Sequence, residues 1–310
     1  MEIAFLLAKS IGGLFLIMVV GAVFVKTKIL TSENSKAVSK IILYLAMPTS
    51  IIRSFQVECT PEKLTDFGIA LLGAMLCQAV FMLIGWGMKR KGFNTVEITS
   101  VEYPTVANLT IPLVTATLGE EWVIFTAAYT ALQNIFCWTH QRTVLSGERA
   151  NLKKIFLNVN ILAIVIGLVM FVFRIKLPVF LGDVFSMTAA TLGPLSMFLV
   201  GMTVAAADLK AIFSNKRLYG VLLLRMIICP MLMATIFVLS GMARMTEHAH
   251  TVLIVLMLSA AGPISAMTTQ FAQLYDNMPE YAGSLNVASM IVCIVTMPLM
   301  IAYYQFLLML

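Results

Sequence analysis

Two proline-containing segments carry polar side chains inside otherwise apolar runs. The first covers residues 105–117 around Pro112, and the second covers residues 259–273 around Pro263. A proline removes one backbone N–H from a helix and displaces the carbonyl four residues earlier. At membrane depth, such backbone is tolerated only beside other protein or a cavity. The helices are therefore predicted to break at Pro112 and Pro263 and to line a binding site there.

The side chains around these prolines could bind a small anion. Their hydroxyl and amide groups donate and accept hydrogen bonds, and the N-termini of half-helices offer partial positive charge. The predicted substrate-binding residues are Thr105, Asn108, Thr110, Pro112, Pro263, Ser265, Thr269 and Gln270. The alternative is that the prolines only kink the helices and that the polar side chains join neighbouring helices.

Two charged residues inside apolar stretches are candidates for charge or coupling roles. Glu102 is an intramembrane carboxylate, which is a functional hypothesis by default, and its alternative is an interfacial carboxylate paired with a base or water. Arg225 either binds a carboxylate substrate or, as we favour, pairs with a structural acid such as Asp208, because buried charges are usually partnered. No metal site or cofactor is predicted. Coupling to Na⁺ or H⁺ stays open, since backbone carbonyls with neutral side-chain oxygens can bind Na⁺.

The composition of the chain makes a bilayer its solvent. Of 310 residues, 60% are hydrophobic and 12% are charged, with a mean hydropathy of +0.94. A span needs roughly 20 apolar residues. Apolar stretches fall at about 3–25, 37–55, 64–88, 98–118, 121–146, 154–173, 179–207, 216–242, 249–274 and 281–308. The fold class predicted is an all-α integral membrane protein with ten transmembrane helices.

The distribution of basic residues predicts the orientation of these helices. Fourteen of the 21 lysines and arginines fall in one set of alternate connections and five in the other. Because cytoplasmic loops carry the excess of positive charge, both termini are expected outside, in a bacterial cytoplasmic membrane. The basic residues form no stripe interleaved with aromatic side chains, so nucleic acid is not expected as a partner.

Prolines recur in matching order in the two halves of the chain. Pro48 and Pro194 lie in the second and seventh stretches, and Pro112 and Pro263 lie in the fourth and ninth. An odd number of helices per unit makes the second copy enter the membrane from the opposite face. We therefore predict a 5+5 inverted repeat, with residues 1–150 as the first unit and residues 151–310 as the second. Helices 4 and 9 are expected to cross near the middle of the bilayer.

Short motifs near the two prolines resemble the auxin efflux carrier family. The sequence T-I-P-L at 110–113, followed by G-E-E at 119–121, is similar to the family's G-I-P-L and G-E-E, and A-G-P at 261–263 with F-A-Q-L-Y at 271–275 is similar to its ninth helix. The family includes plant PIN exporters and bacterial malonate or malate permeases. The resemblance implies the crossed-helix inverted fold of sodium/proton antiporters and bile-acid symporters. Thr105 and Thr110 depart from it, because they stand where the family has Asn and Gly.

These features together predict a secondary transporter. Its expected substrate is a small organic anion, a mono- or dicarboxylate similar to auxin, malonate or malate, moved by alternating access at the crossing of helices 4 and 9. A solute-sensing membrane receptor or a channel built on a carrier fold is the alternative. An enzyme is not expected, because no H-E-x-x-H, G-x-S-x-G or P-loop motif occurs. The expected partners are the substrate and the lipid bilayer, and a homodimer is left open.

Overall fold

The computed structural model describes residue 13 and residues 16–31, 34–147 and 159–309, without the side chains of Lys36, Ala107, Asn108, Gln273 and Met309. Four helical stretches within this part of the chain are long and apolar enough to cross a membrane, namely Pro61–Arg90, Val179–Ala206, Lys216–Leu239 and Pro279–Leu308. Shorter apolar helices are Leu16–Lys26, Val159–Val172 and Ala249–Ala260. The protein is a multi-pass helical membrane protein.

The first half of the chain continues from the helix Leu16–Lys26 into a series of helices and short helical turns. These are α2 (Asn34–Ile41), the π-helical turn η1 (Ile42–Ala46), α3 (Met47–Ser54), α4 (Pro61–Arg90), α5 (Thr95–Glu102), α6 (Ala107–Thr117), the 3₁₀ turn η2 (Glu120–Trp122), α7 (Val123–Phe136), the π-helical turn η3 (Cys137–Gln141) and α8 (Arg142–Ser146). Several begin at clear caps. Pro61 starts α4 after the Thr60 cap, and Asn94 and Glu97 form a capping box that starts α5.

The described part of the second half begins at residue 159. It contains α10 (Val159–Val172), α11 (Val179–Ala190), α12 (Leu192–Ala206), α13 (Leu209–Ser214), α14 (Lys216–Leu223), the π-helical turn η4 (Leu224–Ile228), α15 (Cys229–Leu239), the 3₁₀ turn η5 (Met242–Arg244), α16 (Ala249–Ala260), α17 (Ala266–Leu274) and α18 (Pro279–Met309). Ser265 caps α17, because its side chain accepts a hydrogen bond from the backbone N–H of Met267.

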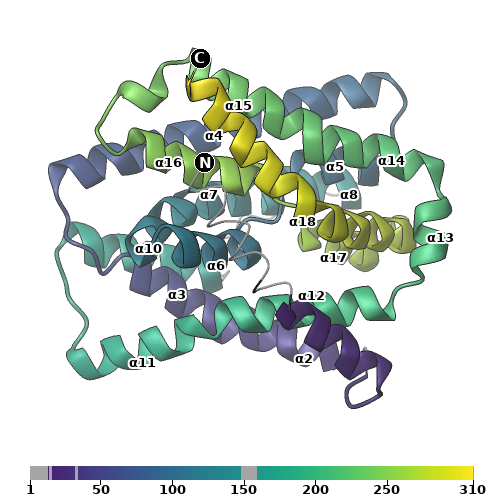
Figure 1. Cartoon of the computed structure of the whole chain (residues 1–310), viewed down its shortest axis with the longest axis horizontal. Coiled ribbons are helices and arrows are strands. Elements are labelled where there is room, and N and C mark those ends of the chain that lie inside the picture. The colour runs from purple at the N-terminus through teal and green to yellow at the C-terminus, as the bar shows by residue number, and fades with distance from the viewer. Residues whose placement is uncertain (1–12, 14–15, 32–33, 148–158, 310) are drawn as a thin grey trace.

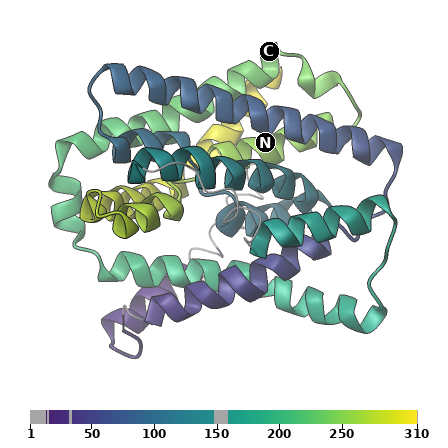
Figure 2. The same ribbon diagram turned by 180° about the vertical axis from the view of Figure 1, so that it is seen from behind.

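The helices form two groups that pack against each other. The first helix group contains Leu16–Lys26, α2, α3, α10, α11 and α12; α3 packs on α10 and α11, and α12 packs on α2. The second helix group contains α4–α8 and α14–α18. In Figure 1, α2, α3, α11 and α12 run along the lower edge, whereas α4, α14 and α15 run along the upper edge. The view from behind in Figure 2 keeps the same two layers. The groups meet where α12 lies against α6 and α3 lies against α7.

The helix α16 forms the centre of the second helix group. Its side chains from Val252 to Ser259 are all fully buried, so α16 is covered on every face. A helix that is apolar all round belongs inside a bundle rather than at its surface. Since α16 is the first half of a broken helix, the break at its end also lies deep in the protein.

The fourth apolar stretch contains two prolines, Pro104 and Pro112, which differ in their effect on the helix. The expectation that the helix breaks at Pro112 is wrong. The helix is interrupted at residues 103–106, between α5 and α6, whereas Pro112 lies inside α6. Pro104 disfavours helical backbone at the residue before it, and Tyr103 is accordingly extended, with φ −121° and ψ 104°. Pro112 removes one helical hydrogen bond, but α6 continues past it. The expected break at Pro263 is found, between α16 and α17.

Close contacts between glycines and backbone join the helix Leu16–Lys26 to α12. A Cβ added to Gly201 would lie 1.8 Å from the carbonyl oxygen of Met18, and one added to Gly21 would lie 2.2 Å from that of Phe198. Small residues permit such close approach between membrane helices. The first helix group therefore depends on these two glycines.

Gly201→Ala is expected to lower the melting temperature of the purified protein in detergent, because its methyl group would overlap the Met18 carbonyl. Overpacking of this kind costs about 1–3 kcal/mol. Gly68→Ala in α4 is the matched control, since nothing lies within 4 Å of a Cβ built there. Equal melting temperatures for the two variants would contradict the close packing of these helices.

Candidate functional site

The two interrupted helices meet at their breaks. The backbone N–H of Thr105 donates to the carbonyl of Pro263 at 2.6 Å, and that of Ser265 donates to the carbonyl of Tyr103 at 3.0 Å. Pro104 and Ile264 form an antiparallel bridge, and the Thr105 hydroxyl donates to the Ile264 carbonyl at 2.9 Å. Residues 103–106 and 261–265 thus pair as two short extended segments. We call this pairing the crossing.

Side chains from neighbouring helices satisfy the remaining backbone groups of the crossing. Gln133 of α7 donates to the Pro104 carbonyl, Asn286 of α18 donates to the Ile264 carbonyl at 2.8 Å, and the Ser289 hydroxyl accepts from the Ile264 N–H at 3.0 Å. Position 262 has no room for a side chain, because a Cβ added to Gly262 would lie 2.4 Å from the Thr105 carbonyl oxygen. Irregular backbone in a membrane interior needs such partners, and the crossing has them in the side chains of α7 and α18.

Arg225 holds the carbonyl ends of both broken helices. Its guanidinium is fully buried and donates to the carbonyls of Ala260 at 2.6 Å, Gly262 at 2.9 Å and Val101 at 3.4 Å. The same group lies 4.9 Å from the centre of the Phe81 ring. A cation is favourable there because the C-termini of α5 and α16 carry partial negative charge.

The expected pairing of Arg225 with Asp208 is wrong. Asp208 instead caps α13, where its carboxylate accepts from the backbone N–H of Ala211 at 3.1 Å. Arg225 finds its partners in backbone carbonyls, which the two helix breaks release. These carbonyls cannot be recognised from charge patterns in the sequence, since every residue carries one.

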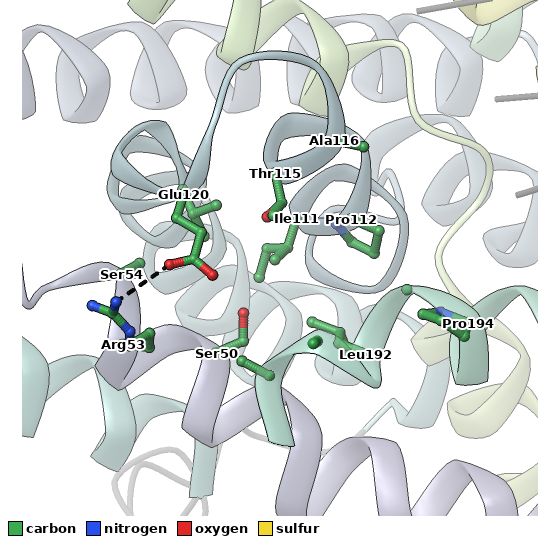
Figure 3. A pocket seen from close by; sticks show the side chains of 14 residues that line it. Ser50, Arg53, Ser54, Ile111, Pro112, Thr115, Ala116, Glu120, Leu192 and Pro194 are labelled. Atoms are coloured by element: carbon green, nitrogen blue, oxygen red, sulfur yellow. Dashed lines mark ion pairs between the residues drawn. The ribbon is translucent and has the colours of Figure 1, made fainter. Parts of the chain in front are cut away.

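A cavity of about 230 Å³ lies between the two helix groups, on the side of α6 that faces α3 and α12. Figure 3 shows its lining. The first helix group contributes Ser50, Arg53, Ser54, Ala189, Ala190, Leu192, Gly193 and Pro194, and the second contributes Ile111, Pro112, Thr115, Ala116, Glu120 and Val123. Both groups therefore shape the cavity, and any movement between them changes it.

An ion pair crosses this cavity from one helix group to the other. Arg53 of α3 and Glu120 of η2 point toward each other in Figure 3, with Nη2 and Oε2 3.6 Å apart. The Arg53 Nε also donates to the Ser186 hydroxyl of α11 at 2.7 Å. The two charged side chains are 35% and 52% exposed. A partly exposed pair at this length is weak, about 0–1 kcal/mol, so another anion can replace Glu120.

The predicted site residues divide among several places. Thr105, Pro263 and Ser265 lie at the crossing, and Pro112 lines the cavity. Thr110 is fully buried in α6, and the Thr269 hydroxyl donates to the Ala282 carbonyl of α18. Gln270 is exposed on α17, and the side chain of Asn108 lies outside the described part of the structure. Glu102 is buried at the end of α5, 3.6 Å from His140.

Several residues of the site were not predicted from the sequence. Pro104 makes the first break, Gln133 and Asn286 support the crossing, and Arg53 with Glu120 spans the cavity. A signal for Arg53 existed, because it is one of five basic residues on the side expected to be outside. Among the described residues, no group of three or more His, Cys, Asp or Glu side chains could hold a metal ion.

A sequence model of the membrane transport protein family matches residues 7–154 and 140–301, which together cover most of the chain. The chain belongs to this family. Its members are the auxin efflux carriers, as the motifs around Pro112 and Pro263 predicted, and this prediction is confirmed. The auxin efflux carrier family is a family of membrane transporters, so the crossing and the cavity belong to a transport protein. A search of curated proteins finds no significant match.

Proposed function

We propose that this protein is a secondary transporter that moves a small organic anion, a mono- or dicarboxylate, across a bacterial cytoplasmic membrane by alternating access. The observation that carries the proposal is the cavity between the two helix groups, in which Arg53 pairs with the partly exposed Glu120 and donates to the Ser186 hydroxyl. A guanidinium binds a carboxylate through two parallel hydrogen bonds. The cavity volume of about 230 Å³ lies below the range of drug-sized sites, which favours a small substrate.

We propose that the chain has ten spans in a 5+5 inverted repeat, with units at 1–150 and 151–310 and both termini outside. Support comes from the two interrupted helices, α5–α6 and α16–α17, each of which contains a proline in its break. The two matches to the family model, 7–154 and 140–301, also divide the chain near its middle, with an overlap at 140–154. With this orientation, the end of α3 and η2 face outward, so the cavity opens to the outside.

Alternating access in this proposal is a movement between the two helix groups. Only the second group contains the crossing, and the contacts of α6 with α12 and of α7 with α3 are the surfaces that slide. An anion first binds Arg53 in place of Glu120. It then reaches the N-terminus of α6, whose partial positive charge and first-turn residues Asn108 and Thr110 we propose as further contacts. Gln270, which is exposed on α17, is not among the contacts of this proposed path.

We propose that Na⁺ does not bind at the crossing. The carbonyls of Ala260, Gly262 and Val101, which could coordinate a cation, already accept hydrogen bonds from Arg225. A fixed guanidinium thus supplies the positive charge that a bound Na⁺ would otherwise bring, and two cations at one place would repel each other.

Calorimetric titration of the purified protein with malonate and with malonamide tests the proposal. Malonate is expected to bind at least about tenfold more tightly, because a charge-assisted hydrogen bond contributes about 1.5–3 kcal/mol. Replacing Na⁺ by choline in the buffer should leave the affinity for malonate unchanged. Equal affinities for the acid and the amide would show that the site does not select an anion. A separate measurement in proteoliposomes distinguishes a carrier from a channel, because a carrier is expected to show saturable exchange of malonate.

A further inference from the structure

Glu102 is a buried carboxyl group without a hydrogen-bonding partner for one oxygen. Its side chain is 3% exposed, and no described residue bonds to its Oε2. The carboxyl group packs on Gly85 of α4, where an added Cβ would lie 2.0 Å from Oε1. An isolated ionised carboxylate is very unfavourable in such a place, and the C-terminus of α5 repels negative charge further. The structure around Glu102 therefore suits the neutral, protonated form.

A second buried glutamate of α5, Glu97, differs from Glu102 in the partners of its carboxyl group. Glu97 is also fully buried, but its carboxylate accepts from the backbone N–H of Asn94 at 2.9 Å and from the Tyr281 hydroxyl at 3.0 Å. It also lies 3.3 Å from the Arg217 guanidinium. Glu97 thus has the partners of a stable ionised carboxylate, whereas the described residues offer the Glu102 carboxylate one ion-pair contact, with His140 at 3.6 Å.

His140 connects Glu102 with the surface of the protein. Its Nδ1 lies 3.6 Å from the Glu102 Oε2 and 2.8 Å from the Tyr103 hydroxyl, and the imidazole is 34% exposed. His140 belongs to η3, and π-helical turns often occur at functional sites. Since imidazole gains and loses a proton near neutral pH, His140 can pass a proton between water and Glu102.

The other titratable groups around this pair keep one charge state near neutral pH. Lys89 of α4 acts on His140, Cys137 of η3 and Tyr103 lie beside the pair, and Arg225 of η4 bonds to the carbonyl of Val101, the residue before Glu102. Lysine and arginine stay protonated at neutral pH, and tyrosine and cysteine stay neutral. Glu102 and His140 are therefore the two groups that exchange protons here.

Glu102 directly precedes the crossing in the chain. Tyr103 follows Glu102, and its carbonyl accepts the hydrogen bond from Ser265. An ionised Glu102 would repel an anion at the N-terminus of α6, which begins five residues further along the chain. Protonation of Glu102 and binding of the anion are thus favourable to each other, and this linkage is reciprocal.

We propose that Glu102 and His140 form the proton-binding site of this transporter, and that each cycle carries one proton with one anion in the same direction. His140 takes the proton from water and passes it to the Glu102 carboxylate, which releases it by the reverse route after the helix groups have moved. No other bond is made or broken. This inference rests on the proposed function, since the proton drives transport only if an anion is moved.

Proteoliposomes with labelled malonate test the coupling. In the wild type, an inward proton gradient is expected to drive accumulation of malonate. Glu102→Gln, which resembles the protonated acid, should reduce gradient-driven accumulation about tenfold, within the usual range of coupling between sites. The exchange of external for internal malonate should stay within about twofold of wild type, because it needs no net proton movement. Glu97→Gln is the matched control for accumulation.

Infrared spectroscopy of the purified protein at neutral pH, without a substrate, tests whether Glu102 is protonated. The band of a protonated, buried carboxyl group should be present in the wild type, absent from Glu102→Gln and retained in Glu97→Gln. Retention of this band, or of gradient-driven accumulation, in Glu102→Gln would overturn the inference. Absence of malonate exchange in the wild type would instead contradict the proposed function, while the infrared result would still decide whether Glu102 holds a proton.

Discussion

Arg53→Gln is expected to reduce malonate uptake about tenfold to a hundredfold while the protein keeps its fold. The guanidinium is the cation in the cavity, and loss of a charge-assisted hydrogen bond costs about 1.5–3 kcal/mol. Arg53→Lys should lie between the wild type and Arg53→Gln, because lysine keeps the charge but not the planar pair of donors. Initial rates of uptake at low substrate concentration, with melting temperatures as a check on folding, measure the effect.

Glu120→Gln should have the opposite effect. Glu120 pairs with the Arg53 guanidinium in the absence of substrate, so a neutral glutamine removes a carboxylate that competes with malonate. Malonate binding should therefore become a few fold tighter. This increase should vanish in the Arg53→Gln background, because the two side chains act on the same interaction. If both single variants weaken binding equally, the ion pair is only a structural bridge between α3 and η2.

Arg225→Met is expected to abolish transport and to lower the melting temperature by several degrees. Methionine fills much of the same space but leaves the carbonyls of Val101, Ala260 and Gly262 without their donor. A buried polar group left unpaired costs about 1–3 kcal/mol, and removal of the buried charge offsets part of this cost. Transport should be lost because the crossing depends on both helix ends being held in one place.

The control for this change is Arg244→Met, since Arg244 is exposed in η5 and makes no contact with the crossing in the described structure. This variant should melt and transport like the wild type. Arg225→Lys should recover part of the stability but not the transport, because a single ammonium group cannot reach the carbonyls of α5 and α16 together. Wild-type transport by Arg225→Met would refute the role of the guanidinium as a clamp.

The location of the first helix break shows the limit of local sequence rules. Both Pro104 and Pro112 satisfy the rule that proline disturbs a helix, and the polar residues around Pro112 made it the better candidate. The break occurs at Pro104 because residues 103–106 find backbone partners in residues 261–265 from the other half of the chain. Among the described residues, no backbone pairing of this kind occurs at Pro112, and the helix continues through it.

The partner of Arg225 illustrates the same limit for charges. A buried arginine predicts a compensating group, and the nearest acid in the sequence was the natural choice. The structure provides carbonyls at the ends of two helices instead, which become available only once both helices have broken and come together. The pairing of Arg53 with Glu120 likewise depends on how α3 and η2 approach each other.

The sequence by itself determined that this chain is a helical membrane transporter of the auxin efflux carrier family, that its ninth apolar stretch breaks at Pro263, and that Glu102 and Arg225 are unusual charges. These properties depend on composition and on local backbone chemistry, which each segment carries with it. Only the tertiary structure decided which proline breaks the fourth stretch, what Arg225 binds, and that Arg53 faces Glu120 across a cavity. Those outcomes depend on contacts between segments far apart in the chain, and a helix end, a carbonyl or a charge acquires its role only from what packs against it.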